Sequence, residues 1–278
     1  MTSSREYTWH LATARVTFDV SAASDRGLVR KINEDSFVAE PPLFLVADGM
    51  GGHAYGDRAS QATADALVAV VRADVPSTTN SVLEAVVSAG VAVRSISDDE
   101  IAGSTLAGVA LVQDRSDAQP HWLAFNIGDS RVYSWDGVVL AQVSIDHSAV
   151  QEMVDEGVIT SVEAMSHPDR NVITRAIGIS GDLEPDVWLL PAGGLQTFLI
   201  CSDGLTKELD DATIGSVLTM PSDVPPADRL VAAALAAGGS DNVTVVVVQS
   251  QVTPPAADPA ASESAEMPAH LQETLPRP

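Results

Sequence analysis

Four aspartates border apolar segments, and three of them stand beside a glycine. The segment LFLVADG ends in Asp48, AFNIGDS in Asp129 and TFLICSDG in Asp203, while Asp241 comes shortly before VTVVVV. One aspartate–glycine pair is typical of a turn, because aspartate bonds to its own backbone and glycine accepts positive φ. Four together favour a shared rim of strand ends, where carboxylates need a positive partner. We therefore expect a site for Mn²⁺ or Mg²⁺, the ions that prefer oxygen ligands.

A glycine-rich motif and a second motif that begins with basic residues add to this pattern. In DGMGG, a side chain at Gly49 would crowd a metal, and the turn could present its carbonyl as a further ligand. Upstream, RKINEDSF places Arg30, Glu34 and Asp35 just before a strand over 36–39. The planar fork of an arginine can donate two parallel hydrogen bonds to phosphate oxygens. Arg30 alone would pass for a solvated surface residue.

Other phosphatase chemistries fit the sequence less well. A cysteine nucleophile would need an arginine six positions after Cys201, and position 207 is a lysine. We therefore expect Cys201 to be a buried strand residue. An aspartyl-phosphate route would need an Asp-x-Asp pair at a strand end, which Asp48, Asp129 and Asp203 lack.

The composition limits the partners and the compartment. A net charge of -23 disfavours a nucleic-acid surface and an anionic membrane. The single cysteine allows no intrachain disulfide, and the six histidines show no zinc-like pairing with it. The apolar stretches are far shorter than the roughly 20 residues of a membrane span, and no signal peptide is recognisable. We expect a cytoplasmic monomer.

The apolar patterns predict mainly strands, with a few helices between them. The strands are expected around 16–20 and at 43–47, 105–112, 122–127, 197–201 and 243–248. Helices are expected at 59–71, at 81–96 with Asn80 as N-cap, and at 226–237. Two successive helices between strands do not suit a regular βαβ alternation, so we expect an α+β fold with mainly antiparallel sheets.

Three regions follow from these patterns. Residues 1–11 show no clear period and are expected to be a loose N-terminus, with an added strand as the alternative. Residues 12–251 would form the folded domain. Residues 252–278 are rich in Pro, Ala, Ser and Glu with little to bury, and are expected to be a disordered tail.

An ordered set of motifs resembles a known family. RKINED, DGMGGH, GSTL, IGDSR, DHS, NVITRAIG, CSDGL and SDNVT together look like the PPM or PP2C family of metal-dependent protein serine/threonine phosphatases, bacterial branch. The resemblance covers roughly residues 14–249. It implies a four-layer α-β-β-α sandwich that binds two Mn²⁺ or Mg²⁺ ions. It also implies that the substrates are proteins phosphorylated by Ser/Thr kinases.

The resemblance also implies the metal ligands. Asp48 would bridge the two ions, with Asp203 and Asp241 on the first. Glu34 and the Gly49 carbonyl would hold the second. A third, weaker ion between Asp129 and Asp203 is implied as well.

Further roles carry over from the same motifs. Arg30 would bind the substrate phosphate, while Asp35 and Asn242 would act from the second layer around the metals. Met50 stands where eukaryotic relatives have a histidine. His53 is therefore a candidate general acid, beside a structural role or a metal-bound water as the acid.

The implied reaction is direct attack on phosphorus by a water that bridges the two ions. The motifs leave open a hydrolase of small phosphate esters, a catalytically silent phosphoprotein-binding pseudophosphatase, and a specialised phosphatase acting on an anti-sigma partner. The segment 146–176 is expected to be a flap that carries substrate choice.

Overall fold

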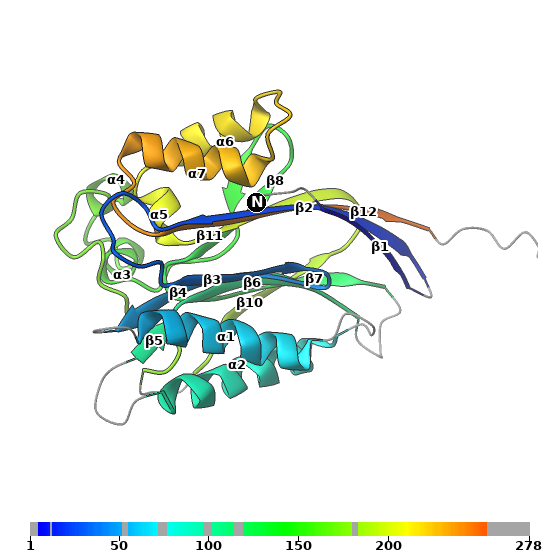
Figure 1. The fold of residues 1–278 in the computed structure, drawn as a ribbon, viewed down its shortest axis with the longest axis horizontal. Helices are drawn as coiled ribbons and strands as arrows, with labels where there is room; N and C mark the ends of the chain where they lie inside the picture. Colours follow the sequence, from blue (N-terminus) through cyan, green and yellow to red (C-terminus); the bar gives the residue numbers. More distant parts are fainter. Residues whose placement is uncertain are drawn as a thin grey trace, which may run out of the picture.

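A computed structural model describes residues 5–11, 13–51, 55–71, 77–96, 102–113, 119–179 and 183–254. Within them, two antiparallel sheets pack face to face (Figure 1). In order across the first sheet, the strands are β1 (Arg5–His10), β2 (Arg15–Asp25), β12 (Val243–Thr253), β11 (Gly194–Cys201), β8 (Arg131–Trp135) and β9 (Leu140–Gln142). Those of the second are β10 (Asp186–Pro191), β7 (His121–Ile127), β6 (Leu106–Val112), β4 (Leu43–Gly51) and β3 (Asp35–Glu40), with β5 (Ala102–Ser104) paired to β4.

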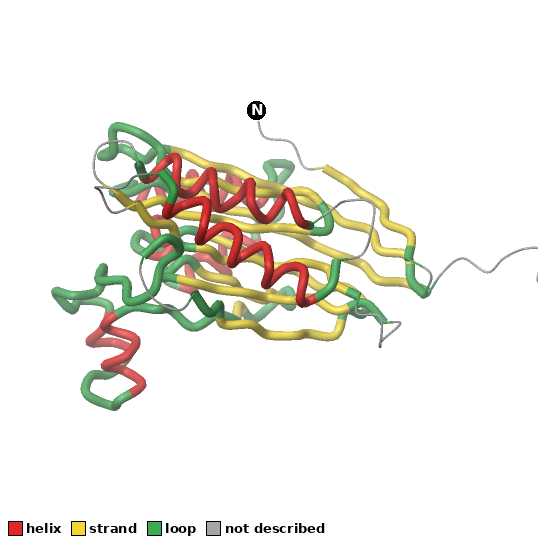
Figure 2. Tube along the Cα trace, turned by 90° about the horizontal axis from the view of Figure 1, so that it is seen from below, coloured by secondary structure: helices red, strands yellow, loops and turns green. Residues whose placement is uncertain are grey.

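Helices cover the outer face of each sheet. Two long helices, α1 (Gly56–Val70) and α2 (Thr79–Arg94), lie across the second sheet, as Figure 2 shows from their side. The first sheet carries α6 (Asp211–Thr219) and α7 (Pro226–Ala237) on its outer side (Figure 1). Three short helices lie at one end of the sandwich: α3 (Ala149–Asp155), α4 (Ser161–Ala164) and α5 (Asp203–Thr206). The expected α+β class and the four-layer α-β-β-α order are confirmed.

Continuous apolar strands arise because the central strands are buried on both faces. In β4, Leu43 and Leu45 face the core under α1 and α2, whereas Phe44 and Val46 face the other sheet. An aromatic group joins the two sheets at the middle, with ring centroids 5.2 to 6.2 Å apart between its neighbours Phe18, Phe44, Trp122 and Phe198. A third core, between the first sheet and its helices, holds Cys201.

The helix at 226–237 is confirmed, and the other two expected helices start earlier than predicted. The first begins at Gly56. The second begins at Thr79, and its N-cap is Thr78, not Asn80, because the Thr78 hydroxyl accepts a hydrogen bond from the Ser81 N–H in a capping box. Strands β8, β9 and β10 and helix α6 were not predicted, because their apolar patterns run over short lengths of 3 to 9 residues.

For residues 1–11, a loose N-terminus is not found at Arg5–His10, which instead form the added strand, β1, at the edge of the first sheet. Tyr7 and Trp9 pack against the core between the sheets, and this burial holds the strand in register with β2. Strand β12 continues to Thr253, two residues beyond the expected domain end. The expected disordered tail covers residues 252–278, and residues 255–278 of it lie outside the part of the chain that the structure describes.

Among the described residues, no helix is both long and apolar enough to cross a membrane.

Candidate metal and phosphate site

Segments far apart in the sequence bring acids to one end of the sandwich. Asp48 near the end of β4 lies directly opposite Asp35 at the start of β3. Asp203 opens α5 immediately after β11, and Asp241 stands two residues before β12. These segments meet at the end of the molecule where α5 is labelled (Figure 1). The sequence-based expectation of a shared rim is therefore confirmed for the backbone positions.

The carboxylates of this end interact electrostatically. Burial raises the pKa of Asp48 well above its usual range, and the charges of Asp35, Asp203, Asp129 and Asp241 raise it further. Like charges disfavour ionisation only when they lie within several ångströms of one another in a poorly solvated place. Five carboxyl groups therefore share one electrostatic environment that favours added positive charge.

Asp35 is held by a short relay from β12. The Ser202 hydroxyl donates to Asp35 Oδ2 at 2.8 Å, and the Thr244 N–H donates to that hydroxyl oxygen at 3.0 Å. The other carboxylate oxygen, Oδ1, is buried without a hydrogen-bond partner. Burial raises the pKa of Asp35 to about 7, with neighbouring Asp203 adding to the rise. Asp35 is thus fixed in direction and still has one free acceptor.

Two cationic side chains meet Asp241. Arg30 donates from Nε to Oδ1 at 2.7 Å and from Nη2 to Oδ2 at 2.9 Å, a bidentate pair. Lys207 Nζ lies 2.8 Å from Asp241 Oδ2 and 2.5 Å from Asp203 Oδ2. Burial alone would raise the pKa of Asp241, but the hydrogen bonds from Lys207 and Arg30 lower it. Asp241 is therefore ionised in this arrangement.

Asn242 holds the loop that carries Arg30 and Glu34. Its side-chain oxygen accepts a hydrogen bond from the Glu34 N–H at 2.9 Å, and its amide nitrogen donates to the carbonyls of Arg26 and Ile32, both at 2.9 Å. The side chain is buried with its hydrogen bonds directed into one loop. This geometry supports the positioning role expected for Asn242.

Gly49 brings two potential oxygen ligands together, for a reason different from the one expected. A Cβ on Gly49 would lie 1.9 Å from the Gly56 carbonyl oxygen, so the clash is with the start of α1. A Cβ on Gly56 would in turn meet Glu34 Oε1 at 2.4 Å and the Gly49 carbonyl oxygen at 2.9 Å. The Glu34 carboxylate and the Gly49 carbonyl therefore face the same small space, which only glycines leave open.

Comparison with known proteins places this geometry in a family. The sequence model of the family described as protein phosphatase 2C matches residues 30–236, which is most of the chain. The chain belongs to the protein phosphatase 2C family. The resemblance seen in the motifs is therefore confirmed.

Three relatives illustrate the membership in this family. Serine/threonine protein phosphatase PstP of Mycobacterium tuberculosis is 41% identical over 241 residues, covering 84% of this chain and 46% of that protein. The chain thus spans about half the length of that relative. Serine/threonine phosphatase stp of Listeria monocytogenes is 33% identical, over 83% of this chain and 95% of that protein. A crystal structure of the catalytic domain of PstP in complex with two manganese ions has a TM-score of 0.73 and 36% identity, covering 86% of this chain and 99% of that one.

The donors in this protein phosphatase 2C member fit hard cations. Asp35, Asp129 and Asp203 each leave one buried carboxylate oxygen without a hydrogen-bond partner, although Lys207 forms an ion pair with the other oxygen of Asp203. No three acid, histidine or cysteine side chains of the described residues converge on one point as a finished coordination sphere. The free oxygens are nevertheless the ligand type that Mg²⁺ and Mn²⁺ prefer.

Asp129 lies beside the other acids on a separately built loop. Burial raises its pKa to about 7, and Asp203 adds to the rise. The loop is fixed by His147, whose Nδ1 accepts from the Gly128 N–H at 3.2 Å, and Arg131 forms a bidentate pair with Asp146. The family motifs IGDSR and DHS thus meet in space.

Of two further residues singled out in the sequence, Cys201 and His53, the structure describes only Cys201. Cys201 is fully buried, and burial raises the pKa of its thiol to about 12, so the expected structural role is confirmed. His53 lies outside the described residues, so its role as general acid stays a prediction.

Lys207 is the site residue that sequence reasoning missed. In the sequence, position 207 is noted only as a lysine where a cysteine-based phosphatase would need an arginine. Its spacing of four residues from Asp203 was the available signal, because residues i and i+4 of a helical turn lie on one face.

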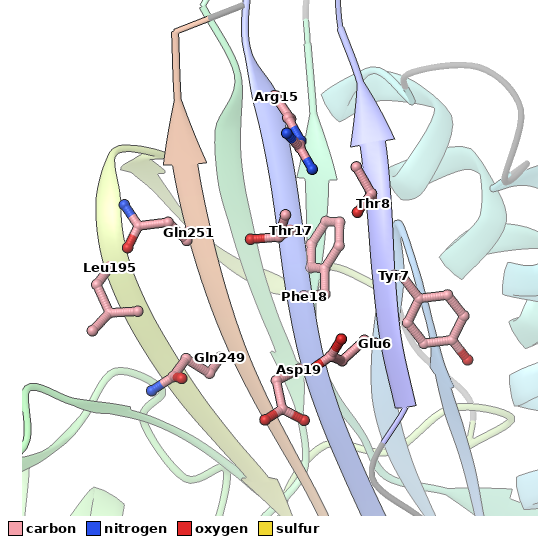
Figure 3. Close-up of a pocket in the computed structure, with 10 residues that line it drawn as sticks. All are labelled: Glu6, Tyr7, Thr8, Arg15, Thr17, Phe18, Asp19, Leu195, Gln249 and Gln251. Carbon is pink, nitrogen blue, oxygen red and sulfur yellow. The ribbon is translucent and has the colours of Figure 1, made fainter. Parts of the chain in front are cut away.

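Two surface pockets differ in whether a residue of the acid site lines them. A pocket of about 350 Å³ opens on the outer face of β1, β2, β12 and β11, lined by polar residues such as Thr17 and Gln249, and shares no residue with the acid site (Figure 3). A wider groove of about 640 Å³ is lined by Asp35 together with Asp57 and Arg58 of α1. Of the five acids of the site, this groove includes Asp35.

Proposed function

We propose that this chain is a metal-dependent protein phosphatase that hydrolyses phosphoserine and phosphothreonine. The observation that carries the proposal is the meeting of five carboxyl groups at one sandwich end, where burial and then their charges raise the pKa of Asp48 and where buried oxygens stay unpaired. Membership in the protein phosphatase 2C family supports the reaction. The manganese ions in the related PstP structure support the cofactor, Mn²⁺ or Mg²⁺.

In this proposal, the side chains divide the work by their positions. Asp48 would bridge two cations, with Asp203 and Asp241 on one and with Glu34 and the Gly49 carbonyl on the other. When bound, such a pair acidifies a water and offsets charge on the phosphoryl oxygens. A third ion at Asp129 and Asp203 remains part of the proposal.

Arg30 would bind the substrate phosphate. In the structure its two N–H groups already form a bidentate pair with a carboxylate, and the same fork fits two phosphate oxygens. The side chain is half exposed, so it can turn from Asp241 to an incoming phosphate. Asp35 and Asn242 would hold the surrounding atoms in place.

We infer that the substrates are proteins phosphorylated by Ser/Thr kinases, in a bacterial signalling pathway. The strongly negative charge supports partners other than nucleic acids and anionic membranes. The single buried cysteine agrees with a reducing compartment such as the cytoplasm, where the protein would act as a monomer.

The test is phosphate release from phosphothreonine peptides and from a generic aryl phosphate, measured with Mn²⁺ and then with excess EDTA. We expect activity with Mn²⁺ on both substrates and none with EDTA. Asp48→Asn, prepared in parallel, should lower turnover by several orders of magnitude because it removes a ligand charge, and so excludes a contaminating phosphatase.

Each other outcome counts against the proposal in a distinct way. Activity that survives EDTA would refute the metal dependence. Cleavage of the aryl phosphate without the peptides would identify a hydrolase of small esters. Binding of the peptides without release of phosphate would identify a pseudophosphatase.

A further inference from the structure

Lys207 is in an unusual place for a lysine of this protein. The chain has two lysines, Lys31 and Lys207, against 13 arginines. Lys31 is exposed, whereas the side chain of Lys207 is 27% exposed and its ammonium group bridges Asp203 and Asp241. Arg30, the other cation here, forms its ion pair and hydrogen bonds with Asp241 among the described acids. Lys207 therefore joins two acids that come from separate segments of the chain.

The ammonium group of Lys207 uses oxygens that a cation would also need. It contacts Asp203 Oδ2 and Asp241 Oδ2, while Asp203 Oδ1 stays buried and unpaired. The positive charge of Lys207 also acts on Asp129, because it opposes the rise that burial causes in the pKa of that carboxyl group. A divalent ion placed between the same carboxylates would lie within a few ångströms of this positive charge and would be repelled by it.

We propose that Lys207 is a built-in competitor of the bound cations: it holds Asp203 and Asp241 together in the metal-free protein and weakens metal binding by competing for their oxygens. The proposal rests on the proposed metal site and adds its regulation. Metal loss then costs the fold little, because an internal charge replaces the ion. The occupancy of the site follows the free metal concentration, since the competing charge keeps the affinity moderate.

Removal of Lys207 should therefore lower the stability of the protein in EDTA and raise its affinity for Mn²⁺. In Lys207→Met, the carboxylates lose a partner, so the melting temperature in EDTA should fall by several degrees. The same variant should bind Mn²⁺ more tightly by at least about tenfold, measured by isothermal titration calorimetry at pH 7.5, because the repulsion is gone. A lysine that merely positioned the ligands would give weaker binding when removed.

Matched variants separate charge from packing. Lys207→Arg keeps the charge and should bind Mn²⁺ within about threefold of the wild type. Lys31→Met removes the same charge from an exposed position, and its affinity should change much less than that of Lys207→Met. Unchanged or weaker binding by Lys207→Met would overturn the proposal. A wild-type protein that binds no Mn²⁺ at all would refute the proposed function instead.

A measurement on the wild-type protein needs no variant. With two lysines, protein labelled with ¹³C at lysine Cε gives two signals, and Lys31→Arg assigns them. Titration with Mg²⁺ should shift the Lys207 signal with the same midpoint as the binding heat, because its ammonium group gives up carboxylate contacts. A Lys207 signal that stays in place while Mg²⁺ binds would overturn the competition.

Discussion

Arg30 shows at the scale of one residue how an ion pair can prepare a binding group. The guanidinium is held in the site by Asp241, in the same two-pronged geometry that a phosphate would use. Arg30→Ala should therefore chiefly raise the Michaelis constant for a phosphopeptide, with a smaller effect on kcat. Steady-state kinetics test this. Arg15→Ala, which changes an exposed arginine on the outer face of the first sheet, is the control. An unchanged Michaelis constant in Arg30→Ala would remove Arg30 from phosphate binding.

Asp35 gives a prediction about pH and stability. Its pKa is raised to about 7 in the folded protein, so between about pH 4 and 7 the folded state holds a proton that the unfolded state releases. This group therefore makes the metal-free protein less stable as pH rises through that window. Asp35→Asn should raise the free energy of unfolding in EDTA at pH 8 by about 1 kcal/mol or more, and by much less at pH 4.

Urea unfolding at both pH values measures that difference. Because His147 and the remaining acids are present in both proteins, comparing Asp35→Asn with the wild type isolates the contribution of Asp35. A variant that is less stable than the wild type at pH 8 would contradict the raised pKa.

At this scale the sequence predicted the acids better than the cations. An aspartate beside a glycine after an apolar run is visible locally, which is how Asp48 and Asp203 were found. The partners of Asp241 were not visible, because Arg30 and Lys207 reach it across 211 and 34 positions of the chain. Side-chain pairs over such separations depend on the fold.

At the scale of elements, the junction of β4 and α1 shapes the site. Gly49 and Gly56 allow the strand, the helix and Glu34 to approach without side chains between them. Gly49→Ala should abolish Mn²⁺ binding and activity, because its Cβ would overlap the Gly56 carbonyl and push α1 away. Gly193→Ala is the control, since a Cβ there meets nothing within 4 Å. Calorimetry with Mn²⁺ would decide, and normal binding by Gly49→Ala would contradict the proposed role.

Element prediction succeeded where one pattern ran for many residues. The strand over 243–248 and the helix over 226–237 are long and uniformly apolar or clearly periodic, and both were found. Strand β1 was expected only as an alternative, because four of its six residues are exposed and its stability comes from pairing with β2 and from Tyr7 and Trp9 in the core between the sheets. That partner is contributed by the fold and cannot be seen in a six-residue window.

At the scale of the whole molecule, the two sheets place the acids on a rigid frame. Core residues between the sheets and under both helical layers hold β4, β11 and β12, whose ends carry or adjoin Asp48, Asp203 and Asp241. The apolar patterns predicted the α+β class with mainly antiparallel sheets, and the family motifs implied the layer order. The end of the domain was predicted to within two residues, but its start was not, because the edge strand β1 lies before the apolar stretches that reveal the domain.

The segment after β12 gives a prediction for the whole chain. Residues 255–278 contain few large apolar residues, and their removal should leave the melting temperature and the phosphatase activity unchanged. The truncated protein must keep Thr253, the last residue of β12. A large loss of activity on truncation would assign the tail a part in catalysis.

The central claim is that carboxylates from distant segments form one cation site at the end of the sandwich. Anomalous diffraction from crystals grown with Mn²⁺ tests it most directly, because it locates each ion independently of any assay. The account predicts two strong peaks that both contact Asp48, one beside Asp203 and Asp241 and one beside Glu34. Well-ordered side chains at these positions with no peak between them would contradict it.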